Sequence, residues 1–159
     1  MSVTTHDISL ETLDALQGYD ALCLFVGEDE RPLQGTAGYV DWRMCGGLSH
    51  VLKEGFFTGA EADSLLVPTL GRFPIPRIFV IGVGASKRVN PESLGRVLAR
   101  AAEVLGKVKA ESVALEIPGE GVVDEGTRAG AFKTQFLPAF KNRRVAVLGG
   151  KPLQRLLAD

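Results

Sequence analysis

The sequence predicts an α/β protein with a mixed central sheet between helices, and three observations lead to this fold class. Short apolar runs that end at glycine or proline alternate with segments of helical periodicity, as in a sheet covered by helices. Two of the runs, residues 63–70 and 77–84, are separated by only six residues, which predicts an antiparallel hairpin. Hydrophobic residues form 45% of the 159 residues, a content typical of one globular core.

The first third of the chain predicts an outer strand, a short helix, a central strand and a longer helix. Residues 3–10 contain β-branched side chains with weak alternation, and residues 9–17 place three leucines on one helical side. Residues 20–27 form a continuous apolar run, which is typical of a strand covered on both faces. Across residues 39–53 apolar side chains recur at helical spacing, so one helix is expected there.

The middle of the chain contains the hairpin strands and the clearest helix. The run 77–84 is almost entirely β-branched or aromatic, and it therefore predicts a central strand. Residues 90–107 begin with Asn90 as N-cap and Pro91 at the first helical position, and they carry one apolar stripe. Charged side chains of both signs line the opposite side, which indicates a solvated face.

The last third predicts two further strands around a helix. The strands are expected over residues 111–118 and 143–150, and the helix over residues 124–137. We expect residues 1–150 to form a single domain. A short amphipathic tail is expected over residues 151–159, where leucines recur on one side.

Charge and hydropathy exclude several classes of partner. The formal net charge is −1, so no global field attracts the chain to nucleic acid or to an anionic membrane. The N-terminus lacks a basic segment followed by an apolar core, and no apolar run approaches the ~18 residues that a membrane span needs. We therefore expect a soluble, cytoplasmic protein without a membrane partner.

The residues that usually hold metals or cofactors are sparse. Cys23 and Cys45 lack both the density of a disulfide framework and the spacing of a zinc pair, so both are interpreted as reduced packing residues. The acidic cluster of Glu28, Asp29 and Glu30 lacks the spacing of an oxygen-ligand loop and is expected at a solvated loop tip. No cofactor, metal site or catalytic residue is predicted.

The glycine-rich turn at the end of residues 77–84 resembles a phosphate-binding loop but matches neither common motif. From Gly82 it reads Gly-Val-Gly-Ala-Ser-Lys, whereas a dinucleotide fingerprint requires a third glycine where Lys87 stands and a Walker A loop places lysine before serine. A structural turn is therefore the main interpretation, and an anion held by backbone N–H groups is the alternative. The candidate ligand-binding residues are Gly46, Gly47, Gly82, Gly84, Ser86 and Lys87.

Five stretches of the chain together carry a resemblance to a known family. They read DALCLFVGEDERPLQG, GGLSHVLKEGFFTGAEADSLLVPTLG, RIFVIGVGASKRVNPESLGRVLARAAEVL, ESVALEIP and DEGTRAGAFKTQF. In this order they resemble the N-terminal domain of the leucyl (cytosol) aminopeptidase family. The resemblance implies a three-layer α/β/α fold with a mixed central sheet, similar to macro domains.

The same resemblance implies where catalysis does not occur. In the family, two metal ions are bound by a separate C-terminal domain around a signature that reads Asn-Thr-Asp-Ala-Glu-Gly-Arg. The 159 residues contain no such signature, so no metal-binding or catalytic residue is carried over to this sequence. We therefore expect a stand-alone, non-catalytic binding or interaction domain without peptidase activity.

A protein partner or a second copy of the chain is the first expected partner, and two apolar segments are the expected contacts. Their residues are Phe56, Phe57, Leu153, Leu156 and Leu157.

Three alternatives stay open. Glycine-rich loops at the strand ends, residues 82–84 and 119–121 together with the Gly46–Gly47 pair, are candidates for macro-domain-like binding of ADP-ribose or another nucleotide. DNA binding, with affinity that falls steeply with salt, is the second alternative and would use Arg143, Arg144 and Lys151. The third is a regulatory subunit of a separately encoded aminopeptidase.

Overall fold

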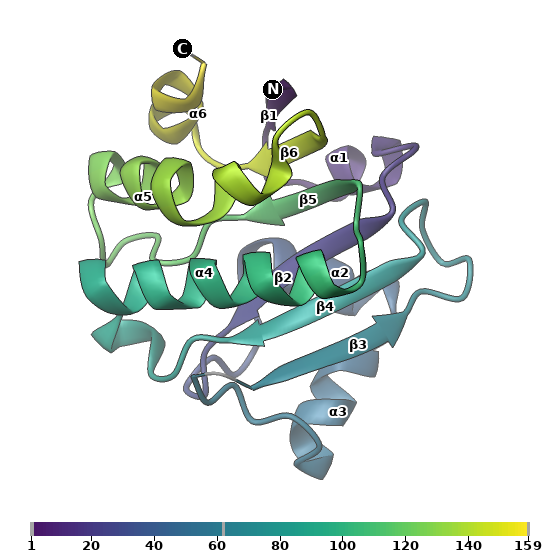
Figure 1. Ribbon diagram of the computed structural model, residues 1–159. Coiled ribbons are helices and arrows are strands. Elements are labelled where there is room, and N and C mark those ends of the chain that lie inside the picture. The colour runs from purple at the N-terminus through teal and green to yellow at the C-terminus, as the bar shows by residue number, and fades with distance from the viewer. Residues whose placement is uncertain (1, 62, 159) are drawn as a thin grey trace.

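The computed structural model describes residues 2–61 and 63–158, and it shows a six-stranded sheet between two layers of helices (Figure 1). The strands follow the order β1-β6-β5-β2-β4-β3, and β3 pairs antiparallel with β4 while the other neighbours are parallel. The predicted mixed sheet and hairpin are confirmed. The strands are β1 (Ser2–His6), β2 (Ala21–Val26), β3 (Ser64–Pro68), β4 (Arg77–Gly82), β5 (Ser112–Glu116) and β6 (Arg144–Leu148).

Helices cover both faces of this sheet. In Figure 1, α4 and α5 lie in front of the sheet, and α2 and α3 lie behind it. Buried residues of α6 join the core on the α4 side, whereas those of α1 join the core on the α2 side. None of the described helices is long and apolar enough to cross a membrane. The helices are α1 (Leu10–Ala15), α2 (Gly35–Arg43), α3 (Gly47–Glu54), α4 (Pro91–Lys107), α5 (Glu125–Ala131) and α6 (Lys151–Leu157).

The continuous apolar run of β2 reflects its place in the middle of the sheet. Cys23 packs into the core under α4, while Leu22 and Leu24 pack into the core under α2. Successive side chains of a strand point to opposite faces, and here both faces are covered, so each position must be apolar. Parallel neighbours on both sides, β4 and β5, complete the burial of this strand.

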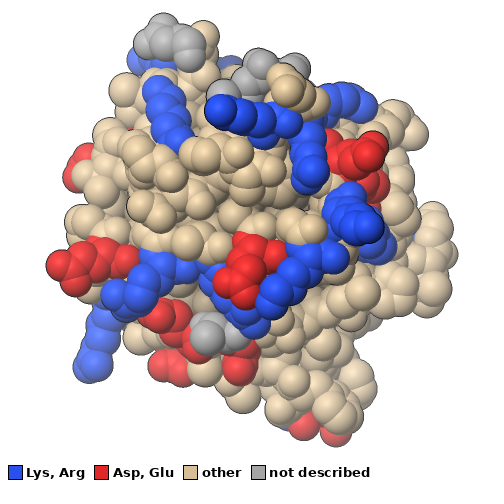
Figure 2. Space-filling model, viewed as in Figure 1, with Lys and Arg blue, Asp and Glu red and all other residues tan. Residues whose placement is uncertain are grey.

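Helix α4 begins as its sequence predicts. The Asn90 side chain accepts a hydrogen bond from the Ser93 N–H, and the Ser93 hydroxyl accepts one from the Asn90 N–H, with Pro91 in the first turn. These bonds satisfy donors that the helix itself leaves free. On the exposed side, Glu103 lies between Arg100 and Lys107, and Figure 2 shows charges of both signs across this face, as expected of a solvated helix.

The prediction of one helix over residues 39–53 is wrong, because the chain reverses between α2 and α3. Cys45 and Gly46 adopt left-handed backbone conformations, with φ of 57° and 81°. The Asp41 carboxylate then accepts hydrogen bonds from the backbone N–H groups of Leu48 and Ser49, which begin the second helix. Apolar spacing continues across this break, so periodicity alone predicts a single helix.

The helix expected over residues 124–137 is regular only in its first half. After α5 the chain continues as a π-helical turn, Phe132–Phe136, and a 3-10 turn, Leu137–Phe140. The rings of Phe132, Phe136 and Phe140 stack in series, with centroids 5.5 and 4.8 Å apart, and all three side chains are buried. The three rings therefore form part of the core that α4 covers.

Candidate ligand-binding cleft

A cavity of about 250 Å³ opens at the carboxyl ends of three adjacent strands, β5, β2 and β4. After β2 the chain enters α2 on one face of the sheet, whereas after β4 it enters α4 on the other face. Connections that diverge in this way leave a crevice outside the strand ends, which is where open α/β sheets bind ligands. The topology therefore builds a candidate ligand-binding cleft at this edge.

Two kinds of side chain line the cleft. Three carboxylates come from separate segments: Glu30 from the loop after β2, Glu116 from the end of β5, and Glu120 from the loop that follows. The apolar part of the lining consists of Leu24, Phe25, Ala37, Val83, Val89, Pro118 and Val122. An apolar wall with a few convergent polar groups is the usual composition of a small-molecule site.

Glu116 is fixed against the start of helix α2. Its Oε1 accepts hydrogen bonds from the Thr36 backbone N–H at 2.9 Å and from the Thr36 hydroxyl at 2.7 Å. Gly35 has a φ of 55°, and a Cβ at this position would lie 2.8 Å from the same carboxylate, so a glycine is required. Burial raises the pKa of Glu116 above its usual value, and the negative charge of Glu120 adds to this, while the two Thr36 hydrogen bonds oppose it.

The loop after β2 is tied to the turn after β4. Asp29 Oδ1 accepts hydrogen bonds from the Ser86 backbone N–H and from the Ser86 hydroxyl, each at 2.7 Å. These bonds favour the charged form and lower the pKa of Asp29 to about 2. Its neighbour Glu30 is more deeply placed, and burial raises the pKa of that carboxyl. Of the acidic cluster expected at a solvated loop tip, Glu28 and Asp29 are exposed, whereas Glu30 forms part of the cleft wall.

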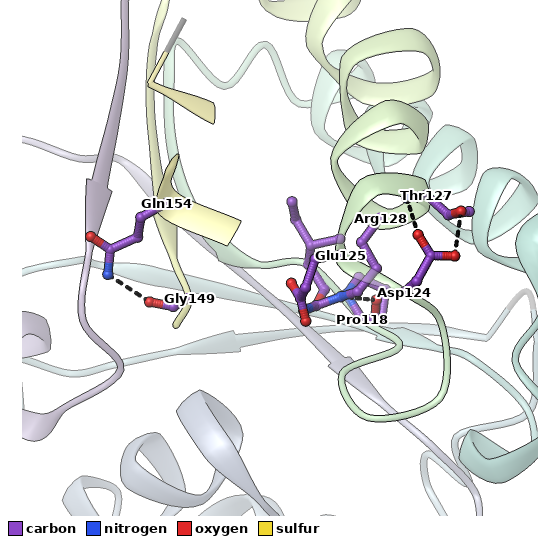
Figure 3. A network of polar contacts seen from close by, with 8 residues as sticks. Pro118, Asp124, Glu125, Thr127, Arg128, Gly149 and Gln154 are labelled. Atoms are coloured by element: carbon purple, nitrogen blue, oxygen red, sulfur yellow. Dashed lines mark hydrogen bonds and ion pairs between the residues drawn. The ribbon is translucent and has the colours of Figure 1, made fainter. Parts of the chain in front are cut away.

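The loop that carries Glu120 is held from below by a buried arginine. Arg128 extends from α5 toward this loop, where its Nε donates to the Pro118 carbonyl at 3.2 Å and its Nη2 donates to the Ile117 carbonyl (Figure 3). The same guanidinium pairs with Glu125, at 2.8 Å, and only 2% of the Arg128 side chain is exposed. The lip of the cleft is thus fixed by a charged group that is itself fully packed.

The family model for the N-terminal domain of the cytosol aminopeptidase family matches residues 22–149. The chain belongs to this family. A probable cytosol aminopeptidase from Thermosynechococcus vestitus is 31% identical over 103 residues, which cover 64% of this chain and 21% of that protein. The chain therefore spans about a fifth of the length of this curated relative of the family.

Solved structures show how the fold of the family domain relates to others. A tomato leucine aminopeptidase mutant superposes with a TM-score of 0.69 and 21% identity, over 99% of this chain and 35% of that chain. A Trypanosoma brucei macrodomain in complex with ADP-ribose superposes with a TM-score of 0.73 and 10% identity, over 97% of this chain and 66% of that chain. The three-layer, macro-domain-like fold predicted from the sequence is confirmed.

The six predicted ligand-binding residues do not form one site. Ser86 lines the cleft, whereas Gly46 lies at the junction of α2 and α3 beside a different hollow that also includes Trp42. Gly82 allows close packing, because a Cβ there would lie 2.0 Å from the Ala60 carbonyl oxygen. Gly84 serves the same turn through its N–H, which donates to the Gly59 carbonyl.

The other two members of that set also lie outside the cleft wall. Lys87 is exposed in the 3-10 turn Ser86–Arg88, and Gly47 begins α3. The backbone N–H groups of Gly84 and Ser86, which the alternative of a bound anion would use, donate to Gly59 and Asp29 within the protein. Ser86 is the one residue of the set that lines the cleft.

The expected partner contacts divide into buried and exposed residues. Phe57, Leu153 and Leu157 are buried in the two cores and present no docking surface, which corrects that expectation for these three. Phe56 and Leu156 are exposed, at 79% and 39%. An apolar stripe that completes the core and one that binds a partner have the same periodicity, so the sequence does not distinguish the two roles.

Sequence reasoning did not include Glu116, Thr36 and Gly35 among the site residues. A charged residue at the end of the buried run SVALE was the available signal, because a carboxylate in a core strand requires hydrogen-bond partners. The described residues contain no group of three or more His, Cys, Asp or Glu side chains that could hold a metal ion.

The basic residues that DNA binding would use have partners within the domain. Arg143 donates to the Ala110 carbonyl, and Arg144 lies over the Tyr19 ring with 4.4 Å between its guanidinium carbon and the ring centroid. Lys151 pairs with Asp7 at 3.2 Å. Asp7 offsets the charge of Lys151, and the contacts of the two arginines hold their guanidinium groups against the domain.

We expect Glu116→Gln to stabilise the domain near neutral pH. The pKa of Glu116 is raised from 4.5 in the folded state, so the fold binds protons more tightly than the unfolded chain and loses stability as pH rises through that window. Glutamine keeps an oxygen acceptor for Thr36 and removes the buried charge. Urea unfolding should give a higher midpoint than the parent at about pH 7.5, with the gap closing at about pH 4.

A matched variant at the other end of β5 is the control. Glu111 is exposed just before this strand, so Glu111→Gln should give the same midpoint as the parent at both pH values. A lower midpoint for Glu116→Gln than for the parent near neutral pH would contradict the prediction.

Proposed function

We propose that this domain is a non-catalytic binding module, without peptidase activity of its own, and that the cleft at the ends of β5, β2 and β4 is its ligand site. The observation that carries the proposal is the preformed cavity of about 250 Å³, whose wall includes the Glu116 carboxylate with one of its oxygens, Oε1, hydrogen-bonded to Thr36. The divergence of the chain at this edge supports the assignment, because it is the position where this class of sheet binds ligands.

The family assignment supports the non-catalytic part of the proposal. The match is to the N-terminal domain of the family, and curated relatives are described as probable cytosol aminopeptidases, of which the chain spans about a fifth. The polar groups of the cleft also suit binding better than hydrolysis. The Ser86 hydroxyl donates to Asp29, whose lowered pKa makes it a poor base, so this serine is not activated as a nucleophile.

Interaction with a protein is the second part of the proposed function. Trp42 and Tyr39 of α2 are exposed, at 67% and 42%, beside a shallow hollow that also includes Leu10 and Leu33. Large exposed aromatic residues are typical of protein contact surfaces. This surface of α2 is where a partner or a separately encoded aminopeptidase subunit would dock.

Binding of ADP-ribose or another nucleotide is the second candidate, and the likeness to a macrodomain crystallised with ADP-ribose favours it. The lining of the cleft favours it less. Among the described residues, the lining contains three carboxylates and no lysine or arginine, so a diphosphate would meet charge of its own sign.

The proposal is tested in two arms on the purified chain. We expect no release of the chromophore from leucine p-nitroanilide with added Mn²⁺ or Zn²⁺, and in a fragment screen by ¹⁵N NMR we expect shifts that cluster at the amides of Thr36, Val83, Ser86 and Gly119. Metal-dependent hydrolysis would overturn the non-catalytic assignment. A screen in which no compound shifts these amides would overturn the assignment of the cleft as the ligand site.

A further inference from the structure

Resting on the proposed function, we infer that the cleft selects a small cation, namely a primary ammonium or guanidinium group carried on a compact apolar body. The charges, the hydrogen-bonding atoms and the volume of the cleft each point to this ligand class.

The wall of the cleft carries negative charge that no salt bridge among the described residues pairs. Among the described residues, Glu30, Glu116 and Glu120 take part in none of the seven salt bridges of the domain. The nearby guanidinium groups are engaged elsewhere: Arg31 donates to backbone carbonyls, and Arg128 pairs with Glu125. A cation in the cleft would be attracted by all three carboxylates.

Glu116 presents a free acceptor to this space. Both hydrogen bonds from Thr36 go to Oε1, and Oε2 accepts none from the described part of the chain. An ionised carboxylate accepts only, and its strongest partners are N–H donors that carry positive charge. A ligand ammonium or guanidinium group at Oε2 would complete the coordination of this side chain.

At the N-terminus of α2, where an anion would otherwise bind, the Thr36 N–H is already occupied. The Thr36 N–H lies in the first turn, where free backbone donors and the helix dipole favour negative charge, and this N–H donates to Glu116. The protein thus supplies its own anion at that point. A phosphate would have to displace the Glu116 carboxylate and would also face Glu30 and Glu120.

Two carboxylates of the wall have pKa values that a bound cation would change. The pKa values of Glu30 and Glu116 are both raised, first by burial and then by neighbouring carboxylates. A bound cation would oppose both effects, because an opposite charge favours the ionised form.

The size and lining of the cavity set the rest of the ligand. The cavity volume of about 250 Å³ is smaller than that of sites for drug-sized ligands, which begins at about 300 Å³, so the ligand is compact. Leu24, Phe25, Val83, Val89 and Val122 supply the apolar part of the lining beside the carboxylates. A flat or branched apolar body with one cationic end fits both features.

Three probes that share a phenyl ring and differ in charge test the preference: benzylamine, benzyl alcohol and benzoate. Each is titrated into ¹⁵N-labelled protein at about pH 7.5, where the amine and a carboxylate of ordinary pKa are charged. We expect benzylamine to shift the amides of Thr36, Ser86 and Gly119 with a Kd at least tenfold lower than that of benzyl alcohol, and benzoate to leave them unshifted. A charge-assisted hydrogen bond is about twice as strong as a neutral one, which motivates this ratio.

Glu116→Gln and the control Glu111→Gln assign the effect to one carboxylate. We expect Glu116→Gln to raise the Kd of benzylamine at least tenfold while that of benzyl alcohol changes less than twofold, and Glu111→Gln to change neither. Benzoate or ADP-ribose binding at these amides as tightly as benzylamine would overturn the cation preference and leave the cleft as a ligand site. Absence of shifts with benzylamine also overturns the inference, and the fragment screen then decides separately whether the proposed function survives.

Discussion

Arg128→Met is expected to destabilise the domain by about 3–5 kcal/mol, because it removes a buried charge with its hydrogen bonds. The methionine would occupy similar space, so the loss comes from polar groups rather than from a cavity. The carbonyl groups of Ile117 and Pro118 would lose their donor, and unpaired buried carbonyls are costly. Urea unfolding should show a much lower midpoint with an unchanged m-value.

An exposed arginine, Arg96, provides the matched control. Arg96 forms a comparable two-bond pair with Glu61 on the surface of α4, where solvent screens the interaction. Arg96→Met should leave the urea midpoint nearly unchanged. Equal losses for the two variants would show that burial of Arg128 contributes nothing.

Phe136→Ala is expected to cost about 3–5 kcal/mol, the usual range for truncating a buried phenylalanine. Phe136 is the middle ring of the stack and contacts Phe132 on one side and Phe140 on the other. Its removal leaves a cavity between α4 and the π-helical turn, where two rings lose their stacking partner. Thermal unfolding followed by circular dichroism should show a large fall in Tm.

Phe56→Ala is the control for this truncation. The side chain of Phe56 is 79% exposed, so the same change in volume should alter the free energy of unfolding by no more than about 0.5 kcal/mol. If Phe136→Ala cost as little as Phe56→Ala, the aromatic stack would have no part in the stability of this core.

Elements whose signals are local could be predicted from the sequence. The hairpin of β3 and β4 followed from a short turn, and α4 followed from Asn90 and Pro91 at its start. The break between α2 and α3 was missed because left-handed backbone at Cys45 leaves the apolar spacing intact. Periodicity reports which side of a helix is buried and is insensitive to a change of helix axis.

The cleft could be predicted only in outline. That a cavity opens at the strand ends is expected from the fold class, and Ser86, one of the predicted ligand-binding residues, lines it. The contact between Glu116 and Thr36 joins residues 80 positions apart, and it depends on the pairing of β2 with β5. No local pattern encodes that pairing, so the central carboxylate of the site was missed.

The Glu116 carboxylate, bound at the start of α2, shows that a side chain and not the backbone decides which charge this point of the cleft prefers. The backbone at Gly35 and Thr36 offers a donor to any acceptor, and it is a side chain from β5 that occupies it. Exchange of Glu116 for a short neutral residue would leave the Thr36 N–H free and weaken the preference of the cleft for positive charge, while Glu30 and Glu120 remain in its wall. One substitution at this position can therefore change which ligands the cleft binds while the backbone of the fold stays the same.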